Sequence, residues 1–400
     1  MTAHAAEIAV PARLLLGSGP SPVPERVLRA LAQPTIGHLD PAFGELLDDT
    51  MARLRAVMVT ENRATLAISG TGSAGMEAMV VNFVAPGDRV ICGVNGLFGA
   101  RMADELTRHG ARVVRVEAQW GRSIPNEDLI AALDGDTVAL FVVHGETSTG
   151  VCQPLDGLGE ACHARDALLF VDCVTSLAGQ RIEIDAMDID VAFSGSQKCL
   201  NCPPGLAPFT LGARALDRLS AQSEPCRSWY FDLRAMLEYW REDTGGAPPR
   251  AYHHTAPINM IYALRESLGL VLEEGLTERW ARHERAHEAL RLALEPLGVA
   301  RLAPAEEALH PLLGVSVPEG VDEAQVRRSL LLEHGVEISG GLGPLAGRSW
   351  RIGVMGVGAA LEPQRRLVGG LAEILGNDPS EPLGVLEEQW APRAPIPGGS

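Results

Sequence analysis

The stretch FSGSQKCLNCPPG, residues 193–205, contains Lys198, the only lysine among the 34 lysine and arginine residues of the chain. Arginine replaces lysine readily where only charge and length matter. Its guanidinium stays protonated, however, whereas the surroundings can deprotonate a lysine amine and make it a nucleophile. Lys198 is therefore a candidate for forming a Schiff base with a carbonyl group. The count alone leaves open that an ordinary lysine was retained by chance.

The residues around Lys198 place it on a loop that is held from both sides. The apolar run Val191–Ser194 before it is typical of a strand, and a Pro-Pro-Gly turn follows it. Cys199 and Cys202 form a C-x-x-C motif, which is typical of zinc or redox sites. No second pair or suitably spaced histidines follow closely, and Cys226 is the last cysteine. We interpret the pair as packing residues beside the lysine, with a redox role left open.

Short apolar runs alternate with helical patterns through the first two thirds of the chain. The predicted strands are Thr65–Ser69, Arg89–Val94, Arg112–Val116, Val138–Val143, Leu168–Asp172, Val191–Ser194 and Phe209–Leu211. Helical spacing is found between them, at Met76–Phe83, Met102–His109, Asn126–Leu133 and Leu158–Ala164. Such alternation is typical of a mostly parallel sheet with helices on both faces. We therefore predict the α/β class, with a mostly parallel sheet of seven strands.

The pattern changes after Ala256 and indicates a second, smaller domain. A helical pattern rich in arginine and glutamate spans residues 257–297, with an interruption near Gly275. A strand at 312–317, a helix at 322–334, a strand at 348–352 and a helix at 363–375 follow. We predict an N-terminal arm (1–20), a large domain (21–272), a small C-terminal α+β domain (273–376) and a flexible tail rich in proline and glycine (377–400).

The composition excludes several classes of protein. The formal net charge is −17, whereas nucleic acids and anionic membranes require basic patches on their partners. The first residues lack a basic leader followed by a long apolar core, and no apolar run approaches the roughly 20 residues of a membrane span. Seven unevenly spaced cysteines do not indicate a disulfide framework, and the terminal Gly-Gly-Ser is no peroxisomal signal. We therefore expect a cytoplasmic enzyme.

Residues 69–83, SGTGSAGMEAMVVNF, contain the pattern G-x-G-x-x-G between a predicted strand and a helix. This pattern is typical of dinucleotide-binding folds, but no acidic residue is found where a ribose would need one. More generally, a turn of small residues before a helix directs N–H groups at an anion. Thr71, Gly72 and Ser73 are therefore predicted to bind a phosphate. The alternative is a tight turn that needs glycine for steric reasons.

Asp172 ends the apolar strand LLFVD, at the edge of the sheet where α/β proteins bind ligands. It could pair with a cationic ring nitrogen, or it could simply cap the following loop. The phosphate site, this acid and Lys198 follow one another about 100 and 26 residues apart. Pyridoxal 5′-phosphate needs a phosphate site, an acid at its ring nitrogen and a lysine. The three features together therefore predict this cofactor.

With these motifs the sequence resembles the class V, fold-type I aminotransferases, and within them the alanine–glyoxylate and serine–pyruvate (serine–glyoxylate) branch. The matching segments are SGTGSAGMEA, GVNGLFG, HGETSTGVCQPLDGLGE, VDCVTSLAG, SGSQKCLNCPPG, YHHTAPI and GGLGPLAG. The resemblance extends from LLLGSGPSPVP through WRIGVMG to about Gly376. It implies a fold-type I transferase and a homodimer with shared active sites, in which Tyr252 and Thr255 reach the phosphate of the neighbouring subunit.

The resemblance also implies roles for residues around the cofactor. Lys198 resembles the Schiff-base lysine, and Asp172 the partner of the pyridine nitrogen. Phe98 occupies the position that stacks on the ring, where many relatives have the larger tryptophan. The remaining cofactor contacts implied are Val174 on the other ring face, and Thr71, Gly72, Ser73 and Gln197 at the phosphate, although some relatives have histidine in place of Ser73.

Four further residues are implied to bind the substrate. Arg351, in WRIG, matches an arginine whose planar fork binds the substrate carboxylate. The alternative for it is a surface arginine at a strand edge. Thr147 matches a hydroxyl near the cofactor O3′ and the carboxylate. Gly37 and His38 fall where relatives have a substrate gate that reaches across the dimer.

The activity that follows from the resemblance is a ping-pong transamination. A small amino acid, alanine or serine, would donate its amino group to glyoxylate or pyruvate, so that an alanine–glyoxylate transaminase is the leading expectation. Another donor (aspartate, an aminophosphonate or pyridoxamine), a nucleotide-dependent oxidoreductase and a dithiol or zinc protein are the alternatives. Cysteine desulfuration needs a nucleophilic cysteine on a late loop, and none follows Cys226.

Overall fold

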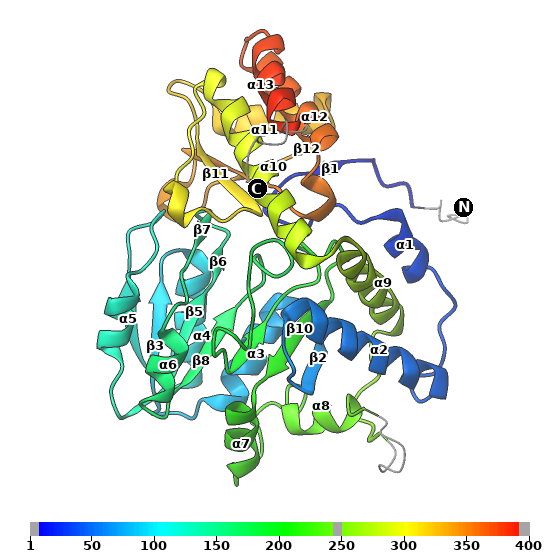
Figure 1. Cartoon of the computed structure of the whole chain (residues 1–400), viewed down its shortest axis with the longest axis vertical. Coiled ribbons are helices and arrows are strands. Elements are labelled where there is room, and N and C mark those ends of the chain that lie inside the picture. Colours follow the sequence, from blue (N-terminus) through cyan, green and yellow to red (C-terminus); the bar gives the residue numbers. More distant parts are fainter. Residues whose placement is uncertain (1–7, 243–249, 392–400) are drawn as a thin grey trace, which may run out of the picture.

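The computed structural model describes residues 8–242 and 250–391. Residues 1–7 of the predicted N-terminal arm and residues 392–400 of the predicted tail lie outside this description. Within the described residues, two hydrophobic cores form: one around a large sheet, and one in the C-terminal part of the chain. Figure 1 shows the C-terminal unit above the unit that contains the sheet.

All seven runs predicted as strands lie in one sheet. Its order is β2 (Ala64–Ser69), β10 (Leu206–Leu211), β9 (Val191–Phe193), β8 (Leu168–Asp172), β5 (Thr137–Val143), β3 (Arg89–Val94) and β4 (Arg112–Glu117). β10 runs antiparallel to both of its neighbours, and the other neighbouring strands are parallel. The predicted α/β class with a mostly parallel seven-stranded sheet is therefore confirmed.

The directions of the strands bring several loops to one edge of this sheet. β2 and β9 are both antiparallel to β10, so that β2 points the same way as the parallel strands. The loops that follow β2, β3, β5, β8 and β9 consequently start at the same edge. This is the edge at which α/β folds bind ligands.

Helices cover the sheet because the segments between the strands are amphipathic. The helices of this unit are α1 (Glu25–Leu31), α2 (Pro41–Met58), α3 (Gly72–Phe83), α4 (Leu97–His109), α5 (Asn126–Ala132), α6 (Leu158–His163), α7 (Ala213–Ala221), α8 (Leu233–Tyr239) and α9 (Ile258–Glu274). On α4, Met102 and Leu106 are buried one helical turn apart, and the helix packs on β3. α2 starts where the Asp40 carboxylate accepts a hydrogen bond from the Ala42 N–H group, and it packs on α9.

The C-terminal unit has its own core and includes part of the N-terminal arm. Its helices are α10 (Leu276–Leu294), α11 (Glu323–Glu333), α12 (Leu361–Ile374) and α13 (Ser380–Trp390). Its strands are β11 (Leu312–Ser316), β14 (Ser349–Gly353) and β13 (Ser339–Gly340), which form an antiparallel sheet, and β1 (Leu14–Leu15), which pairs with β12 (Val336–Glu337). Leu16 and Trp350 are fully buried in this core. Residues 14–16 of the predicted arm are thus part of the C-terminal unit.

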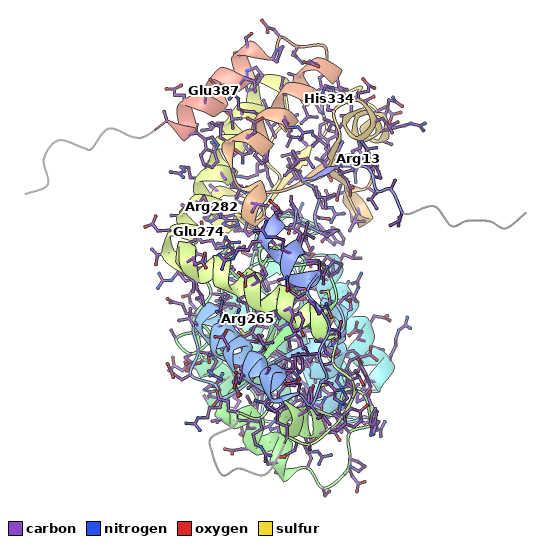
Figure 2. The ribbon with its side chains drawn as sticks, turned by 90° about the vertical axis from the view of Figure 1, so that its right-hand side faces the viewer. Arg13, Arg265, Glu274, Arg282, His334 and Glu387 are labelled. Atoms are coloured by element: carbon purple, nitrogen blue, oxygen red, sulfur yellow. The ribbon has the colours of Figure 1, made fainter. Side chains whose placement is uncertain are left out.

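The two units meet at the predicted break near Gly275. This glycine has φ +83°, and it separates α9 from α10. Glu274, just before the break, forms ion pairs with Arg279 (2.5 Å) and Arg282 (2.6 Å) on α10. Arg282 also donates to the carbonyl group of Gly356 in the C-terminal unit (2.7 Å). Figure 2 shows Glu274 and Arg282 between the two units.

The prediction of a flexible tail was wrong for residues 380–390, which form α13. This helix packs on α10 and α12, with Leu386 fully buried. The indole N–H of Trp390 donates to the Gln364 side chain (2.9 Å). Leu383, Leu386 and Trp390 follow helical spacing, and a proline is tolerated in the first turn of a helix. The composition rich in proline and glycine concealed this apolar stripe.

Short elements complete the described chain. They are the hairpin β6 (Gly145–Glu146) and β7 (Val151–Cys152), and the 3-10 turns at Glu295–Leu297, Ala305–Glu307, Gly343–Leu345 and Gly356–Gly358. Across residues 8–242 and 250–391, no helix combines the length and the apolar character needed to traverse a bilayer.

Candidate active site

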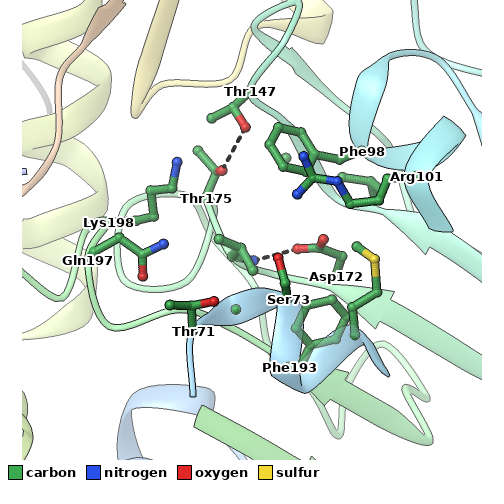
Figure 3. A pocket seen from close by; sticks show the side chains of 15 residues that line it. Thr71, Ser73, Phe98, Arg101, Thr147, Asp172, Thr175, Phe193, Gln197 and Lys198 are labelled. Carbon is green, nitrogen blue, oxygen red and sulfur yellow. Dashed lines mark hydrogen bonds between the residues drawn. The ribbon is translucent and has the colours of Figure 1, made fainter. Parts of the chain in front are cut away.

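A pocket lies at the edge of the sheet where the loops after β2, β3, β5, β8 and β9 meet. Figure 3 shows it with Lys198 and Gln197 on one side, and with Phe98 and Asp172 on the other. The residues that line it are Thr71, Gly72, Ser73, Met76, Phe98, Arg101, Val143, Gly145, Thr147, Asp172, Val174, Thr175, Phe193, Gln197 and Lys198. Every residue predicted to contact the cofactor from within the same subunit is among them.

Lys198 is nearly buried, with 8% of its surface exposed. Burial lowers the pKa of its amine to about 8, and the nearby positive charge of Arg351 contributes to the decrease. The amine donates a hydrogen bond to the backbone carbonyl of Ser18. A lysine with this pKa is partly neutral near physiological pH, so that the amine can act as a nucleophile or as a base.

Residues 18–21, at the junction of the N-terminal arm and the large domain, contact the Lys198 loop, a contact that sequence reasoning missed. The Ser21 hydroxyl donates to the Lys198 carbonyl (2.6 Å), and the Ser21 N–H donates to the Gln197 carbonyl (2.9 Å). Gly19 has φ +108°, and a Cβ atom there would lie 2.7 Å from the amine of Lys198. The glycine is therefore required both by the backbone and by the close approach of the lysine. The proline- and glycine-rich composition of the arm was the available signal.

Asp172 lies at the end of β8, with 3% of its surface exposed. Burial raises the pKa of its carboxyl group to about 7, whereas the hydrogen bond from the Val174 N–H (2.8 Å) and the charge of Lys198 oppose this increase. A cation placed beside the carboxylate would lower its pKa again. Asp172 is thus suited to pair with a positively charged group in the pocket.

One end of the pocket is formed by the start of α3. Thr71 precedes the helix in extended backbone conformation, and no side chain caps the helix. The first N–H groups of a helix and its dipole attract anions. The Gln197 side chain reaches the same part of the pocket, and its amide NH₂ group can donate hydrogen bonds to an anion. This end of the pocket is therefore suited to an anion such as phosphate.

Phe98 and Val174 are half-buried hydrophobic residues on two walls of the pocket. A Cβ atom at Gly72 would lie 2.9 Å from Val174, so that glycine allows this wall to approach the start of α3. Arg101, one helical turn after Phe98, lies with its guanidinium carbon 4.8 Å from the centre of the Phe98 ring. Arg101 was missed at the sequence level, although its spacing from Phe98 places both residues on one face of α4.

Thr147 and Arg351 connect the pocket with the C-terminal unit. The Arg351 guanidinium donates to the carbonyl groups of Gly340 (2.8 Å) and Thr147 (3.4 Å). Its surface is 8% exposed, and no ion pair with an acidic residue forms within the described part of the chain. The Thr147 hydroxyl accepts a hydrogen bond from Thr175 (3.5 Å). The alternative of a surface arginine at a strand edge is therefore excluded, and the buried cation interacts with the charge of Glu146 without forming an ion pair with it.

The remaining predicted residues do not line this pocket. Tyr252 is 59% exposed, and its hydroxyl lies 3.4 Å from that of Thr255. The ring of Tyr252 also contacts the His38 ring, with the centroids 5.1 Å apart. His38 and the adjacent Gly37 thus lie near the Tyr252 segment on the surface. Their predicted contacts with a neighbouring subunit stay predictions.

The C-x-x-C motif beside Lys198 is packed in the core. Cys199 and Cys202 are buried free thiols, and burial raises the pKa of each to about 12. The Cys199 thiol lies 3.5 Å from the carbonyl oxygen of Thr175, to which it donates. These observations support the interpretation of the pair as packing residues.

The family of the chain follows from comparison with known proteins. The family model described as Aminotransferase class-V matches residues 13–345. The chain belongs to the class V aminotransferase family. It is therefore an aminotransferase, and the alternatives of an oxidoreductase and of a dithiol or zinc protein no longer apply.

Solved structures of class V aminotransferases share the whole architecture. The alanine–glyoxylate aminotransferase from Nostoc sp. is 45% identical, with a TM-score of 0.89 over 92% of this chain and 97% of that chain. The ureidoglycine–glyoxylate aminotransferase from Bacillus subtilis is 36% identical, with a TM-score of 0.93 over 97% of this chain and 100% of that chain. The pyridoxamine–pyruvate aminotransferase from Mesorhizobium loti is 25% identical, with a TM-score of 0.87 over 95% of this chain and 97% of that chain. The predicted fold-type I architecture is thereby confirmed.

Proposed function

We propose that the pocket binds pyridoxal 5′-phosphate, with its phosphate at the start of α3 and its ring between Phe98 and Val174. The uncapped helix, the Gln197 amide group, whose NH₂ can donate to a phosphate, and the buried Asp172 at the other end of the pocket support this arrangement. The residues present thus fit the cofactor that class V aminotransferases use.

When bound, the cofactor supplies an aldehyde that condenses with amines and a ring that accepts an electron pair. Lys198 is proposed to hold the cofactor in the resting enzyme, and to carry a proton from and to the substrate Cα during turnover. Its pKa of about 8 suits both directions of proton transfer. Asp172 is proposed to keep a proton on the ring nitrogen, because a buried carboxylate stabilises an adjacent cation.

Arg351 is proposed to bind the substrate carboxylate. Its guanidinium is buried, two of its donors are engaged by carbonyl groups, and its charge has no direct partner among the described residues. A buried cation is costly unless an anion accompanies it, and the guanidinium fork binds carboxylates through paired hydrogen bonds. The observation that carries this proposal is a buried arginine that has no ion pair among the described residues and that lowers the pKa of the nearby Lys198.

The proposed reaction is the transfer of an amino group from a small amino acid to a small 2-oxo acid. Alanine or serine is the proposed donor, and glyoxylate or pyruvate the proposed acceptor. The relatives named above support glyoxylate in particular, since two of the three names contain it. The substrate and the product keep their carboxylate, so that Arg351 serves both halves of a ping-pong cycle.

A panel of amino donors tests the proposal. The purified enzyme with added pyridoxal 5′-phosphate is assayed with alanine, serine and aspartate against glyoxylate and pyruvate. We expect the highest kcat/KM for alanine or serine with glyoxylate. A clear preference for aspartate would contradict the proposed donor. Absence of a cofactor spectrum in the wild-type enzyme would contradict the proposed site itself.

Ureidoglycine and pyridoxamine are second candidates for the donor. A relative from Bacillus subtilis named (S)-ureidoglycine–glyoxylate transaminase is 37% identical over 92% of both chains. Pyridoxamine appears in the name of the Mesorhizobium loti enzyme. Both compounds therefore belong in the panel, and a higher kcat/KM for either of them would replace alanine and serine.

The active enzyme is proposed to be a cytoplasmic homodimer. Exposed hydrophobic residues lie beside the segment expected to reach the partner: Leu39 (61%), Trp229 (68%) and Tyr252 (59%). His253, next to Tyr252, stacks on Trp229 with the ring centroids 4.5 Å apart. All seven cysteines are free thiols, which fits a reducing compartment. Light scattering and cell fractionation test these two points.

A further inference from the structure

Glu146 is a completely buried acid immediately behind the pocket. One carboxylate oxygen accepts hydrogen bonds from the N–H groups of Phe98 (2.9 Å) and Gly99 (3.2 Å). The other accepts from the N–H (3.0 Å) and the hydroxyl (2.6 Å) of Ser148. Each oxygen therefore has two donors, and these hydrogen bonds oppose the increase in the pKa of Glu146 that burial causes.

These contacts connect two walls of the pocket. Phe98 and Gly99 are in the first turn of α4, whose N-cap Gly96 provides no side-chain cap. Glu146 replaces the cap from another loop, and Ser148 adds to it by accepting a hydrogen bond from the Leu97 N–H (2.9 Å). A Cβ atom at Gly96 would collide with Glu146, so that glycine allows the close approach.

The same carboxylate also fixes the loop that carries Thr147. Glu146 and Ser148 precede and follow this residue, and both are bound to the start of α4. The Thr147 side chain faces the pocket, while its carbonyl group accepts from Arg351. One buried acid thus sets the position of Phe98 relative to Thr147.

We propose that Glu146 is a positioning residue that sets the Phe98 ring against the cofactor ring by holding the first turn of α4. The inference rests on the proposed function, because it assumes that pyridoxal 5′-phosphate lies beside Phe98. Glu146 lies outside the pocket and would affect cofactor binding only through the position of the Phe98 ring. Neither cofactor nor substrate touches Glu146 in this arrangement.

Three substitutions separate hydrogen-bond geometry from charge. Glu146→Gln keeps an acceptor at full length, and this oxygen can still accept from Phe98 and Gly99. Its NH₂ group can donate to the Ser148 hydroxyl, so that only the hydrogen bond from the Ser148 N–H is lost. Glu146→Asp keeps the charge but withdraws it by one methylene group. Glu146→Ala removes both the hydrogen-bond acceptors and the charge. If Glu146 acts by position, Gln preserves cofactor binding better than Asp; if it acts by charge alone, Asp preserves it better.

The measurement is the dissociation constant of pyridoxal 5′-phosphate, obtained by titrating the cofactor-free enzyme. We expect an increase of about tenfold or more for Glu146→Ala, a smaller one for Glu146→Gln, and an intermediate one for Glu146→Asp. The visible circular dichroism of the bound cofactor reports the orientation of its ring, and it should change in the same order. Asp322→Asn, which removes an acid at the start of α11, is the matched control and should change neither quantity.

A double-mutant cycle with Phe98→Ala identifies the route of the effect. Since Glu146 acts through Phe98, Glu146→Ala should change the dissociation constant less than about twofold when residue 98 is already alanine. An undiminished effect in that background, or an Asp variant that binds better than the Gln variant, would overturn the inference. If Glu146→Ala does not fold, the cycle is run with Glu146→Asp. Wild-type enzyme that fails to bind the cofactor would instead refute the proposed function.

Discussion

The two units of the molecule contribute to the active site in different ways. The sheet unit provides Asp172, Lys198, Phe98 and the start of α3 from loops that meet at one edge of one sheet. The C-terminal unit provides Arg351 from β14 of a separately packed core. The proposed cofactor end of the site therefore depends on one sheet, whereas the proposed substrate end also depends on how the two units are joined.

The electrostatic properties of the two contributions differ as well. On the sheet side, burial raises the pKa of Asp172 to about 7 and lowers that of Lys198 to about 8, so that both groups titrate near neutral pH. Arg351 stays charged throughout this range, because guanidinium does not lose its proton in proteins. This difference fits the proposal that the sheet unit carries out proton transfer and that Arg351 of the C-terminal unit recognises the charge of the substrate.

The largest expected effect is on turnover when Lys198 is replaced. Both Lys198→Ala and Lys198→Arg should abolish transamination, since guanidinium cannot act as the nucleophile or the base. Steady-state assays measure the loss. An active Lys198→Arg enzyme would break the assignment of proton transfer to the sheet unit. Since the chain has one lysine, borohydride reduction and peptide mapping should place a pyridoxyl group at position 198.

The second largest effect is expected at Arg351. Arg351→Ala should raise KM about a hundredfold for the amino donor and the 2-oxo acid alike, because each loses the paired hydrogen bonds of a charged fork. The control is Arg365→Ala, which removes an ion pair with Glu387 elsewhere in the C-terminal unit and should leave KM unchanged. An increase for only one of the two substrates would show that the carboxylate is not the group recognised.

The pH dependence of Lys198 tests how the two units influence each other. The neutral amine is the reactive form, so that the rate of cofactor attachment to the cofactor-free enzyme should rise with pH, with a midpoint near 8 instead of the ordinary 10.5. The charge of Arg351 lowers the pKa of Lys198, and Arg351→Ala should therefore move the midpoint to higher pH. Stopped-flow absorbance measures the rate. An unchanged midpoint would mean that the units act independently.

The smallest of the expected effects is on stability in acid. Burial lowers the pKa of His144 in the sheet unit to about 4 and that of His283 on α10 to about 3, below the ordinary value of 6.5. Below pH 6.5 these two histidines therefore bind more protons in the unfolded chain than in the folded one, which lowers stability by up to about 1.4 kcal/mol per pH unit for each. Burial raises the pKa of Asp172 and of Glu105 to about 7, and these acids have the opposite effect. Urea unfolding at pH 7, 6 and 5 is therefore compared between the wild type and His283→Asn, and the variant should lose less stability toward pH 5. An equal loss would mean that the pKa of His283 is not lowered in the folded protein.

Much of the sheet unit could be predicted from local sequence. Short apolar runs predicted every strand of the large sheet, and helical spacing predicted the helices between them, although α3 starts at Gly72 and not at Met76, and α4 starts at Leu97 and not at Met102. Asp172 could be identified because it ends a strand, and Lys198 because it is the only lysine of the chain. Local periodicity is sufficient where neighbouring residues decide the structure.

The α/β class and the order of the strands along the chain thus follow from the amino-acid sequence alone, and the single lysine predicts Schiff-base chemistry at position 198. Which distant segments complete the pocket depends on how the chain packs. Ser18 meets Lys198 across 180 residues, and Arg351 meets Thr147 across 204. Glu146 caps α4 from a separate loop, and α13 folds because its apolar stripe is covered by α10 and α12. Such contacts depend on packing between elements that are far apart in the sequence, so that the pattern of neighbouring residues does not predict them.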